Sequence, residues 1–230
     1  MRELGDTWES NLLRVKIPKF YGIPKIHKNP VKAQPIVLCH SALQNPVAKY
    51  ISKLLKPLIA QAKYTCSGTK QFMNDLRKLK LEPGRPFTII SGNVVAYYPN
   101  IPMDNMIEIM NTIWIRYYEV TLTLEDRQSG DYPTPELFCE MLTCAMTDLV
   151  LEGPDGQAYQ QLKGLAMEVA CSPDIANLYS NFFEQQWIHQ AESVAFYKRY
   201  IDDTFAVVYV DHYDDEYLGK KDANTTWMPP

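Results

Sequence analysis

Two runs of β-prone residues near the C-terminus, VAFYKRY and TFAVVYV, are separated only by Ile201-Asp202-Asp203. β-branched and aromatic residues favour strands, and so short an interval leaves room only for a tight turn. The pattern predicts a β-hairpin with two aspartates at its tip. Adjacent carboxylates repel each other and are costly beside buried strands unless a cation or hydrogen-bond donors neutralise them. Mg²⁺, which takes carboxylate oxygens as ligands, is the expected cation, and an ordinary Asp-Asp turn is the simpler alternative.

The composition fits a folded chain. Its 230 residues, 46% of them apolar and 22% charged, indicate one globular domain or two small subdomains that share a core. No run approaches the roughly 18 apolar residues of a membrane span, and the polar N-terminus is unlike a signal peptide. The five cysteines are odd in number and contain no CxxC pair, so the expected compartment is reducing, without a disulfide framework or a zinc site.

The charge is unevenly distributed along the chain. Residues 1–80 carry 15 Lys and Arg against 4 Asp and Glu, a net charge of +11, whereas residues 81–230 carry 8 against 23, a net charge of −15. This division suits a lobe that binds a polyanion beside a site that binds cations. Two solvated faces of unequal charge are the simpler alternative.

Local patterns predict the other elements. Four prolines in 14–37 exclude a helix and favour extended segments joined by turns. Helical patterns are expected at 45 to about 63, at 69 to about 79, from Asp104 as N-cap to about 118, at 135 to about 149, and from Pro173 onward. Strands are expected at 87–90 and 94–98, and a hairpin at 149–162 around a Gly-Pro-Asp-Gly turn.

Four segments in a fixed order resemble one enzyme family. They are FYGIPKIHKNPVKAQPIV with CHSALQNPVAKYISKLLKPL (20–37 and 39–58), GNVVAYYPNIP (92–102), QLKGLAMEVACSPDIANLYSNFFE (161–184), and Tyr200-Ile201-Asp202-Asp203. Together they resemble the reverse transcriptases of Penelope-like retroelements, which are relatives of telomerase. The resemblance covers roughly residues 16–210.

The resemblance implies an α+β fold with the fingers and palm of a reverse transcriptase. Residues 1–85 would form a basic fingers-like region. Residues 86–210 would form the palm-like catalytic region, with 119–132 as a polar connection and an antiparallel palm sheet of three or four strands backed by helices. Residues 211–230 have no periodicity and are expected to form a frayed tail.

The resemblance also implies roles for single residues. In this family two Mg²⁺ ions support the attack of a primer 3′-hydroxyl on the α-phosphate of a deoxynucleotide. Asp202 would hold metal, Asp203 would support it, and the backbone carbonyl of Val94 would add a ligand. Tyr98 matches the aromatic residue that excludes a ribose 2′-hydroxyl, although it could equally be a core residue.

Further positions are implied to contact the nucleotide or the template. The fingers lysines that would neutralise phosphates are Lys25, Lys28 and Lys32. The loop positions that would shape the nucleotide pocket are Gln161, Gly164, Met167, Ser172 and Pro173. A solvated basic face and a plain helix start are the respective alternatives.

Three positions depart from the family pattern. Asn93 stands where the family has the Asp that bridges both metals, and an amide is neutral and offers a single oxygen. Gln34 stands where related fingers carry an Arg that forks onto the triphosphate. Glu168 replaces a Gly whose bare backbone lies against the nucleotide, so its carboxylate would repel phosphate.

The expected function is that of a retroelement RNA-directed DNA polymerase, truncated before a thumb and catalytically impaired by these departures. Its partners would be an RNA template, a DNA primer and deoxynucleoside triphosphates, with no membrane, in the nucleus or cytoplasm. The alternative is a non-catalytic module that binds RNA or an RNA–DNA hybrid through its basic region. A third possibility is a decayed relic without a selected role.

Overall fold

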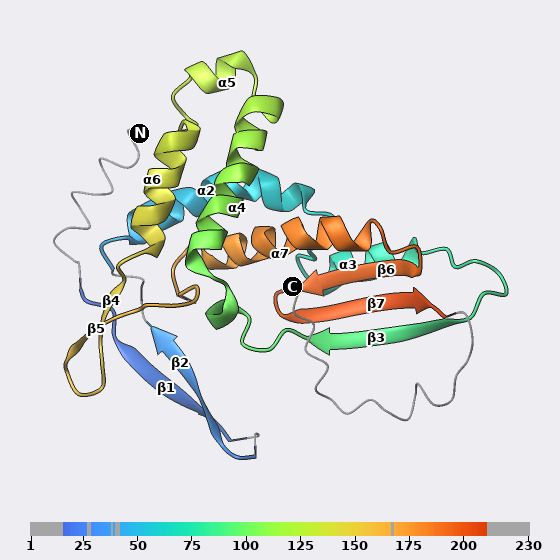
Figure 1. Cartoon of the computed structure of the whole chain (residues 1–230), viewed down its shortest axis with the longest axis horizontal. Coiled ribbons are helices and arrows are strands. Elements are labelled where there is room, and N and C mark those ends of the chain that lie inside the picture. Colours follow the sequence, from blue (N-terminus) through green and yellow to red (C-terminus); the bar gives the residue numbers. More distant parts are fainter. Residues whose placement is uncertain (1–15, 27–28, 38, 40–41, 167, 211–230) are drawn as a thin grey trace. The chain divides into compact units, whose positions relative to one another are not determined.

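The computed structural model describes residues 16–26, 29–37, 39, 42–166 and 168–210 (Figure 1). Its helices are α2 (Asn45–Gln61), α3 (Thr69–Arg77), the 3₁₀ turn η2 (Tyr98–Asn100), α4 (Met103–Arg116), the π-helical turn η3 (Tyr117–Thr121), α5 (Leu124–Gln128), α6 (Pro135–Met146) and α7 (Ser172–Ile188). Its strands are β1 (Phe20–Lys25), β2 (Lys32–Val37), β3 (Phe87–Asn93), β4 (Val150–Glu152), β5 (Ala158–Gln160), β6 (Val194–Tyr200) and β7 (Asp203–Tyr209). In this part of the chain no helix is long and apolar enough to cross a membrane.

The strands of the described residues form small antiparallel sheets, ordered β1-β2, β4-β5 and β3-β7-β6. The mixture of helices with antiparallel sheets agrees with the expected α+β class. Contacts divide the chain into two units, which we name by their content. The helical unit comprises residues 1–60 and 98–176, and the sheet unit comprises residues 61–97 and 177–230. The names fingers and palm remain sequence-based predictions.

The core of the helical unit lies where α4 meets α6. Trp114 of α4 stacks on Phe138 of α6 with ring centroids 4.5 Å apart, and both side chains are fully buried. The indole nitrogen of Trp114 donates to the carbonyl of Pro133, so burial leaves no polar atom of this ring unpaired. The predicted helix after Pro135 is confirmed, and it begins with Thr134 as N-cap, whose hydroxyl accepts from the backbone N–H of Leu137.

One local prediction in this unit needs correction. Asp104 is not the N-cap of α4, because Pro102 takes that position and Asp104 lies within the first turn, where its charge still complements the helix dipole. The predicted polar connection 119–132 contains the short helix α5. There Thr123 and Asp126 form a capping box, with reciprocal side-chain to backbone hydrogen bonds.

The proline-rich N-terminal segment forms the β1-β2 hairpin, as its extended character predicted. Pro24 and Pro35 lie within these strands. A proline cannot donate to a β-ladder, but it is tolerated in a hairpin where each strand has a free edge. The hairpin predicted around the Gly-Pro-Asp-Gly turn is also confirmed, as β4 and β5.

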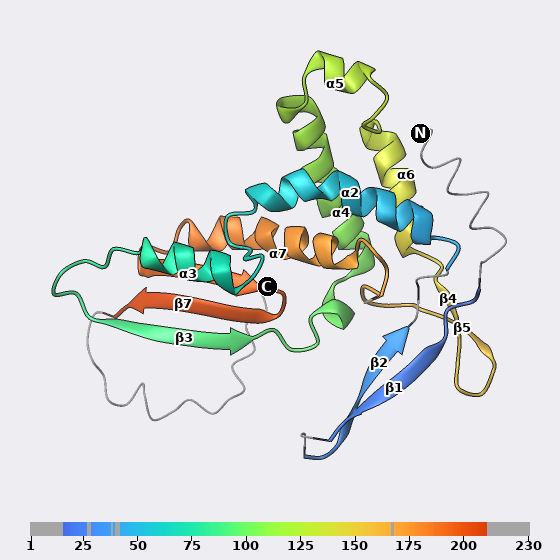
Figure 2. The same ribbon diagram turned by 180° about the vertical axis from the view of Figure 1, so that it is seen from behind.

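The sheet unit contains the predicted hairpin of β6 and β7, with β3 paired to the other edge of β7. Helix α3 lies in front of this sheet in Figure 2. The Phe72 ring of α3 makes edge contacts with Phe196 of β6 at 6.0 Å and with Phe205 of β7 at 5.1 Å. These aromatic contacts attach α3 to the sheet.

The predicted strand at 94–98 is wrong. The strand β3 instead continues through Asn93, and residues 95–97 form a turn in which Ala96 has a φ of +50°. The physical reason is the length of the partner strand. Because β7 begins at Asp203, directly opposite Asn93, β7 has no residue left to pair beyond that point.

Candidate functional site

The hairpin tip places its two aspartates at the end of the three-stranded sheet. Tyr200 is paired with Asp203, so only Ile201 and Asp202 connect β6 to β7. Ile201 has a φ of +56°, a backbone region that β-branched residues rarely adopt. Asp203 is exposed and Asp202 is partly exposed, so both carboxylates are accessible to a ligand.

Asn93 lies beside this tip, although it is 110 positions away in sequence. Its side-chain amide donates to Oδ1 of Asp203 at 3.1 Å. The backbone N–H of Val94 donates to the carbonyl of Asp202 at 2.7 Å. The structure therefore brings Asn93 together with the three positions predicted to bind metal, Val94, Asp202 and Asp203, within one unit.

The chemistry of this group depends on the amide. An Asp in place of Asn93 would face Asp203 with a second negative charge, which only a cation or a proton could relieve. The Asn93 amide instead donates a hydrogen bond to Asp203. In the described part of the chain no three Asp, Glu, His or Cys residues form a group that could hold a metal ion. The carboxylate oxygens of Asp202 and Asp203 are of the kind that Mg²⁺ takes as ligands.

A second set of predicted residues meets in the helical unit. Tyr98 begins η2 and is partly buried, and its carbonyl accepts from the backbone N–H of Leu165 at 2.8 Å. The Gln161 amide donates to the carbonyl of Gly164 at 2.9 Å. Gly164 has a φ of +76°, and a Cβ placed there would lie 2.6 Å from Cα of Pro99. The glycine is therefore required by a close backbone approach.

The start of α7 carries the Ser-Pro pair of the same loop. Ser172 is fully buried, and its hydroxyl finds no hydrogen-bond partner among the described residues. Pro173 is exposed, as expected for an early helical position. Asp174 is buried and accepts two hydrogen bonds from Lys56 of α2, each at 2.8 Å. This pair links α7 to α2 within the helical unit.

The other predicted positions are more dispersed. Glu168 is exposed in the loop before α7, whereas Met167 lies outside the described residues. Lys25 and Lys32 are directly opposite each other in the β1-β2 hairpin. Like charges at such a cross-strand pair are destabilising, and a bound anion would relieve them. Lys28 lies outside the described residues, and the backbone of Gln34 is paired with Ile23 in β2.

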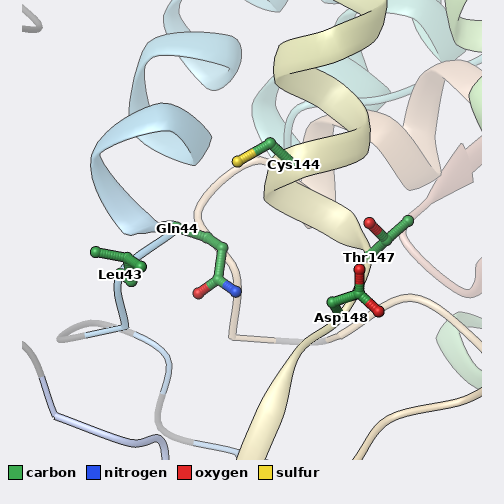
Figure 3. Close-up of a pocket in the computed structure, with 5 residues that line it drawn as sticks. All are labelled: Leu43, Gln44, Cys144, Thr147 and Asp148. Atoms are coloured by element: carbon green, nitrogen blue, oxygen red, sulfur yellow. The ribbon is translucent and has the colours of Figure 1, made fainter.

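A pocket of about 240 Å³ lies elsewhere in the helical unit, between the start of α2 and the end of α6 (Figure 3). Its lining consists of Leu43, Gln44, Cys144, Thr147 and Asp148. None of these was predicted as a site residue. The lining includes one carboxylate and no cationic side chain, so it does not suit a nucleotide phosphate.

A buried charged pair that was not predicted from the sequence joins Arg199 of β6 to Glu184 of α7. Their side chains meet at 2.6 Å, and Arg199 is only 1% exposed. One signal was available in the sequence. A cation inside a β-prone run is expected to find a partner if that strand is buried.

The comparisons with known proteins give a likeness of fold. No protein-family model matches the sequence, and no curated protein does. Among solved structures, telomerase from Candida tropicalis in complex with a TWJ fragment of telomeric RNA matches with a TM-score of 0.61 and 13% identity, over 98% of this chain and 42% of that one. Apo telomerase from the same yeast matches with a TM-score of 0.57 and 12% identity, over 95% of this chain and 45% of that one.

Telomerase from Candida albicans, also in complex with a TWJ fragment of telomeric RNA, gives a TM-score of 0.56 and 11% identity, over 94% of this chain and 43% of that one. The chain thus spans less than half the length of these neighbours. Telomerase is related to reverse transcriptases, so the predicted reverse-transcriptase-like fold is supported. At this level of identity the likeness is one of fold.

Proposed function

We propose that the chain is the reverse-transcriptase domain of a Penelope-like retroelement, an RNA-directed DNA polymerase impaired by Asn93. The observation that carries the proposal is the meeting of Asn93, Asp202 and Asp203 at one end of the β3-β7-β6 sheet. By the resemblance of the sequence, these residues stand at the positions of the family's catalytic motifs, and Asn93 meets the two aspartates from a segment that is distant in sequence. The telomerase-like fold supports the same class.

The proposed substrates are an RNA template, a DNA primer and deoxynucleoside triphosphates, and the proposed location is nuclear or cytoplasmic. Two of the structural neighbours are complexes with telomeric RNA, which supports RNA as the class of partner. The opposed Lys25 and Lys32 of the β1-β2 hairpin and the net charge of +11 that the sequence carries in residues 1–80 support a role of the N-terminal region in binding phosphates. Tyr98 is proposed to exclude ribonucleotides.

The proposed cofactor is Mg²⁺, two ions by analogy with the family. Asp202, Asp203 and the carbonyl of Val94 would hold it, and Asn93 would hold it weakly through its single amide oxygen. When bound, Mg²⁺ would stabilise the negative charge that develops on the phosphates during transfer. The missing carboxylate is expected to cost several kcal/mol of transition-state stabilisation, or on the order of 10³-fold in rate.

A second candidate function is a non-catalytic module that binds RNA or an RNA–DNA hybrid. The hydrogen bond from Asn93 to Asp203 favours it, because the amide partly satisfies that carboxylate without a cation. The two candidates predict the same nucleic-acid binding. They differ in whether restoring the carboxylate restores chemistry.

The deciding experiment is primer extension on a short RNA template with Mg²⁺ and deoxynucleotides. It compares the unaltered chain, Asn93→Asp, and the triple variant Gln34→Arg/Asn93→Asp/Glu168→Gly. Asn74→Asp is the matched control, because it adds the same charge at an exposed position of α3. Hybrid binding is measured for every variant.

Extension by Asn93→Asp, but not by Asn74→Asp, would support a polymerase silenced at one position. Extension by the triple variant alone would indicate that Gln34 and Glu168 also impair the nucleotide pocket. Hybrid binding by all variants without extension by any would favour the binding module. Neither binding nor extension would contradict both functions.

A further inference from the structure

Arg199 is a charged side chain in the interior of the sheet unit. It lies in β6, two residues before the turn residue Ile201, and only 1% of it is exposed. A buried guanidinium is tolerated only when its charge is paired and its donors are hydrogen-bonded. The partners of Arg199 therefore define what this residue does.

Glu184 of α7 pairs with the charge. Nε of Arg199 donates to Oε1 of Glu184 at 2.6 Å, and Nη2 donates to Oε2 at 3.2 Å, which makes the contact bidentate. Burial alone would lower the pKa of Arg199, but the Glu184 carboxylate, together with Tyr97 and Tyr197, more than offsets this effect, so the pKa is raised and the cation is kept. The guanidinium is thus held in one orientation.

Asn177 provides a second anchor. Nη1 of Arg199 donates to its side-chain oxygen at 2.9 Å, and Nη2 donates to its backbone carbonyl at 3.1 Å. Nη2 also lies 3.3 Å from the hydroxyl of Thr65. These contacts come from α7 and from the segment after α2, so the guanidinium is fixed by elements outside its own hairpin.

One further contact reaches the hairpin tip. Nη1 of Arg199 donates to the backbone carbonyl of Ile201 at 3.0 Å. Ile201 is the residue with positive φ, a conformation that persists only where the surrounding structure holds it. The next residue, Asp202, uses its carbonyl to accept from the N–H of Val94. The turn is therefore bonded to Arg199 on one side and to the end of β3 on the other.

We propose that Arg199 is a positioning residue whose guanidinium, anchored by Glu184 and Asn177, holds the Ile201 carbonyl and so sets the Asp202-Asp203 tip beside Asn93. The metal-binding role of this tip rests on the proposed function. The effect of Arg199 on the conformation of the tip does not depend on that function and can be measured without catalysis.

The first test measures amide hydrogen exchange in the unaltered chain and in Arg199→Lys. Lysine keeps the charge but cannot donate to Glu184, Asn177 and Ile201 together. Exchange of the Val94 amide is expected to accelerate about tenfold relative to amides in the middle of β7, as for the loss of one charge-assisted hydrogen bond. Equal exchange of Val94 in both proteins would overturn the proposal.

Tyr197→Phe is the matched control. Its hydroxyl donates to the same carboxylate oxygen of Glu184 at 2.9 Å, so the variant perturbs the buried pair while leaving the bond to Ile201 in place. Val94 exchange is expected to stay within about twofold of the unaltered chain, a change smaller than one hydrogen bond is worth. Equal acceleration by Tyr197→Phe and Arg199→Lys would assign Arg199 a general structural role and overturn the proposal.

The second test measures Mn²⁺ binding by water proton relaxation in the Asn93→Asp background. Adding Arg199→Lys is expected to weaken Mn²⁺ binding about tenfold, whereas adding Tyr197→Phe is expected to leave it unchanged. If Arg199→Lys does not fold, Glu184→Gln keeps the guanidinium, weakens its anchor, and is expected to change both readouts in the same direction.

The two proposals can fail separately. If neither Asn93→Asp nor the triple variant binds Mn²⁺ or extends primers, the polymerase function is contradicted, while Val94 exchange would still decide the positioning role. Conversely, primer extension and Mn²⁺ binding that are indifferent to Arg199→Lys would overturn the positioning role and leave the polymerase function intact.

Discussion

Replacing Gly164 by alanine tests whether the loop before α7 is built on a close backbone approach. Gly164 has a φ of +76°, and a Cβ there would lie 2.6 Å from Cα and 2.7 Å from the carbonyl oxygen of Pro99. Both contacts are with backbone, which cannot rotate away as a flexible side chain can. The Leu165 N–H to Tyr98 carbonyl bond lies beside this contact, so any displacement also disturbs Tyr98.

The expected destabilisation has two parts. A non-glycine residue with positive φ costs about 1–2 kcal/mol. Forcing a methyl group into a well-packed site costs about 1–3 kcal/mol more. Gly164→Ala is therefore expected to lower the free energy of unfolding by about 2–5 kcal/mol, the sum of the two.

Gly156→Ala separates the two parts. Gly156 has the same φ of +76°, but no atom of the described chain lies within 4 Å of where its Cβ would be. This variant should lose only the backbone contribution of about 1–2 kcal/mol. Urea unfolding of both variants is monitored by circular dichroism without ligands. The difference between their losses of unfolding free energy measures the cost of the contact with Pro99. Equal losses at the two glycines would refute the close approach.

Three further predictions address the core, the cysteines and the basic region. Trp114→Ala, which removes a fully buried ring, should cost about 3–5 kcal/mol in urea unfolding, whereas Trp187→Ala, at a half-exposed ring, should cost clearly less; equal costs would contradict the assigned core. Burial raises the pKa of Cys171 to about 12, so in the native protein at pH 8 Cys171 should resist iodoacetamide while the exposed Cys144 is alkylated, as peptide mass spectrometry would show. Alkylation of both cysteines at equal rates would contradict the burial of Cys171. Because the unfolded chain releases the Cys171 proton near its ordinary pKa of about 8.5, the contribution of this thiol to the free energy of unfolding is complete below that pH and is lost as the pH rises toward 12. Binding of an RNA–DNA hybrid should weaken steeply between about 50 and 200 mM salt because of the +11 charge of residues 1–80, and a flat fluorescence-anisotropy profile would contradict that interface.

Several elements could be predicted because their signals are local. Apolar spacing, capping residues and turn residues within short windows predicted the helix from Asn45 and the helix after Pro135. The same kinds of signal predicted the β4-β5 and β6-β7 hairpins. The α+β class was implied by the resemblance of the four motifs to reverse transcriptases. The order of the four motifs allowed the reverse-transcriptase-like fold to be predicted, and the telomerase likeness supports it.

The end of β3 could not be predicted in this way. Both 87–90 and 94–98 are rich in β-prone residues, and Ser91-Gly92-Asn93 between them looks like a break. In the structure these three residues are paired with Phe205, Thr204 and Asp203, and the ladder stops there. The partner strand decides where β3 ends, and local residue propensities contain no information about the length of a partner strand.

By itself, the sequence determined which residues carry charge at the tip, where the hairpin turns, and that position 93 carries an amide and not a carboxylate. Only the tertiary structure decided that this amide reaches Asp203, that Arg199 is buried against Glu184 and holds Ile201, and that Gly164 lies against Pro99. The physical reason is range. Turn and helix preferences act over a few residues, whereas hydrogen bonds between side chains far apart in sequence depend on strand register and packing, which are set by the whole fold.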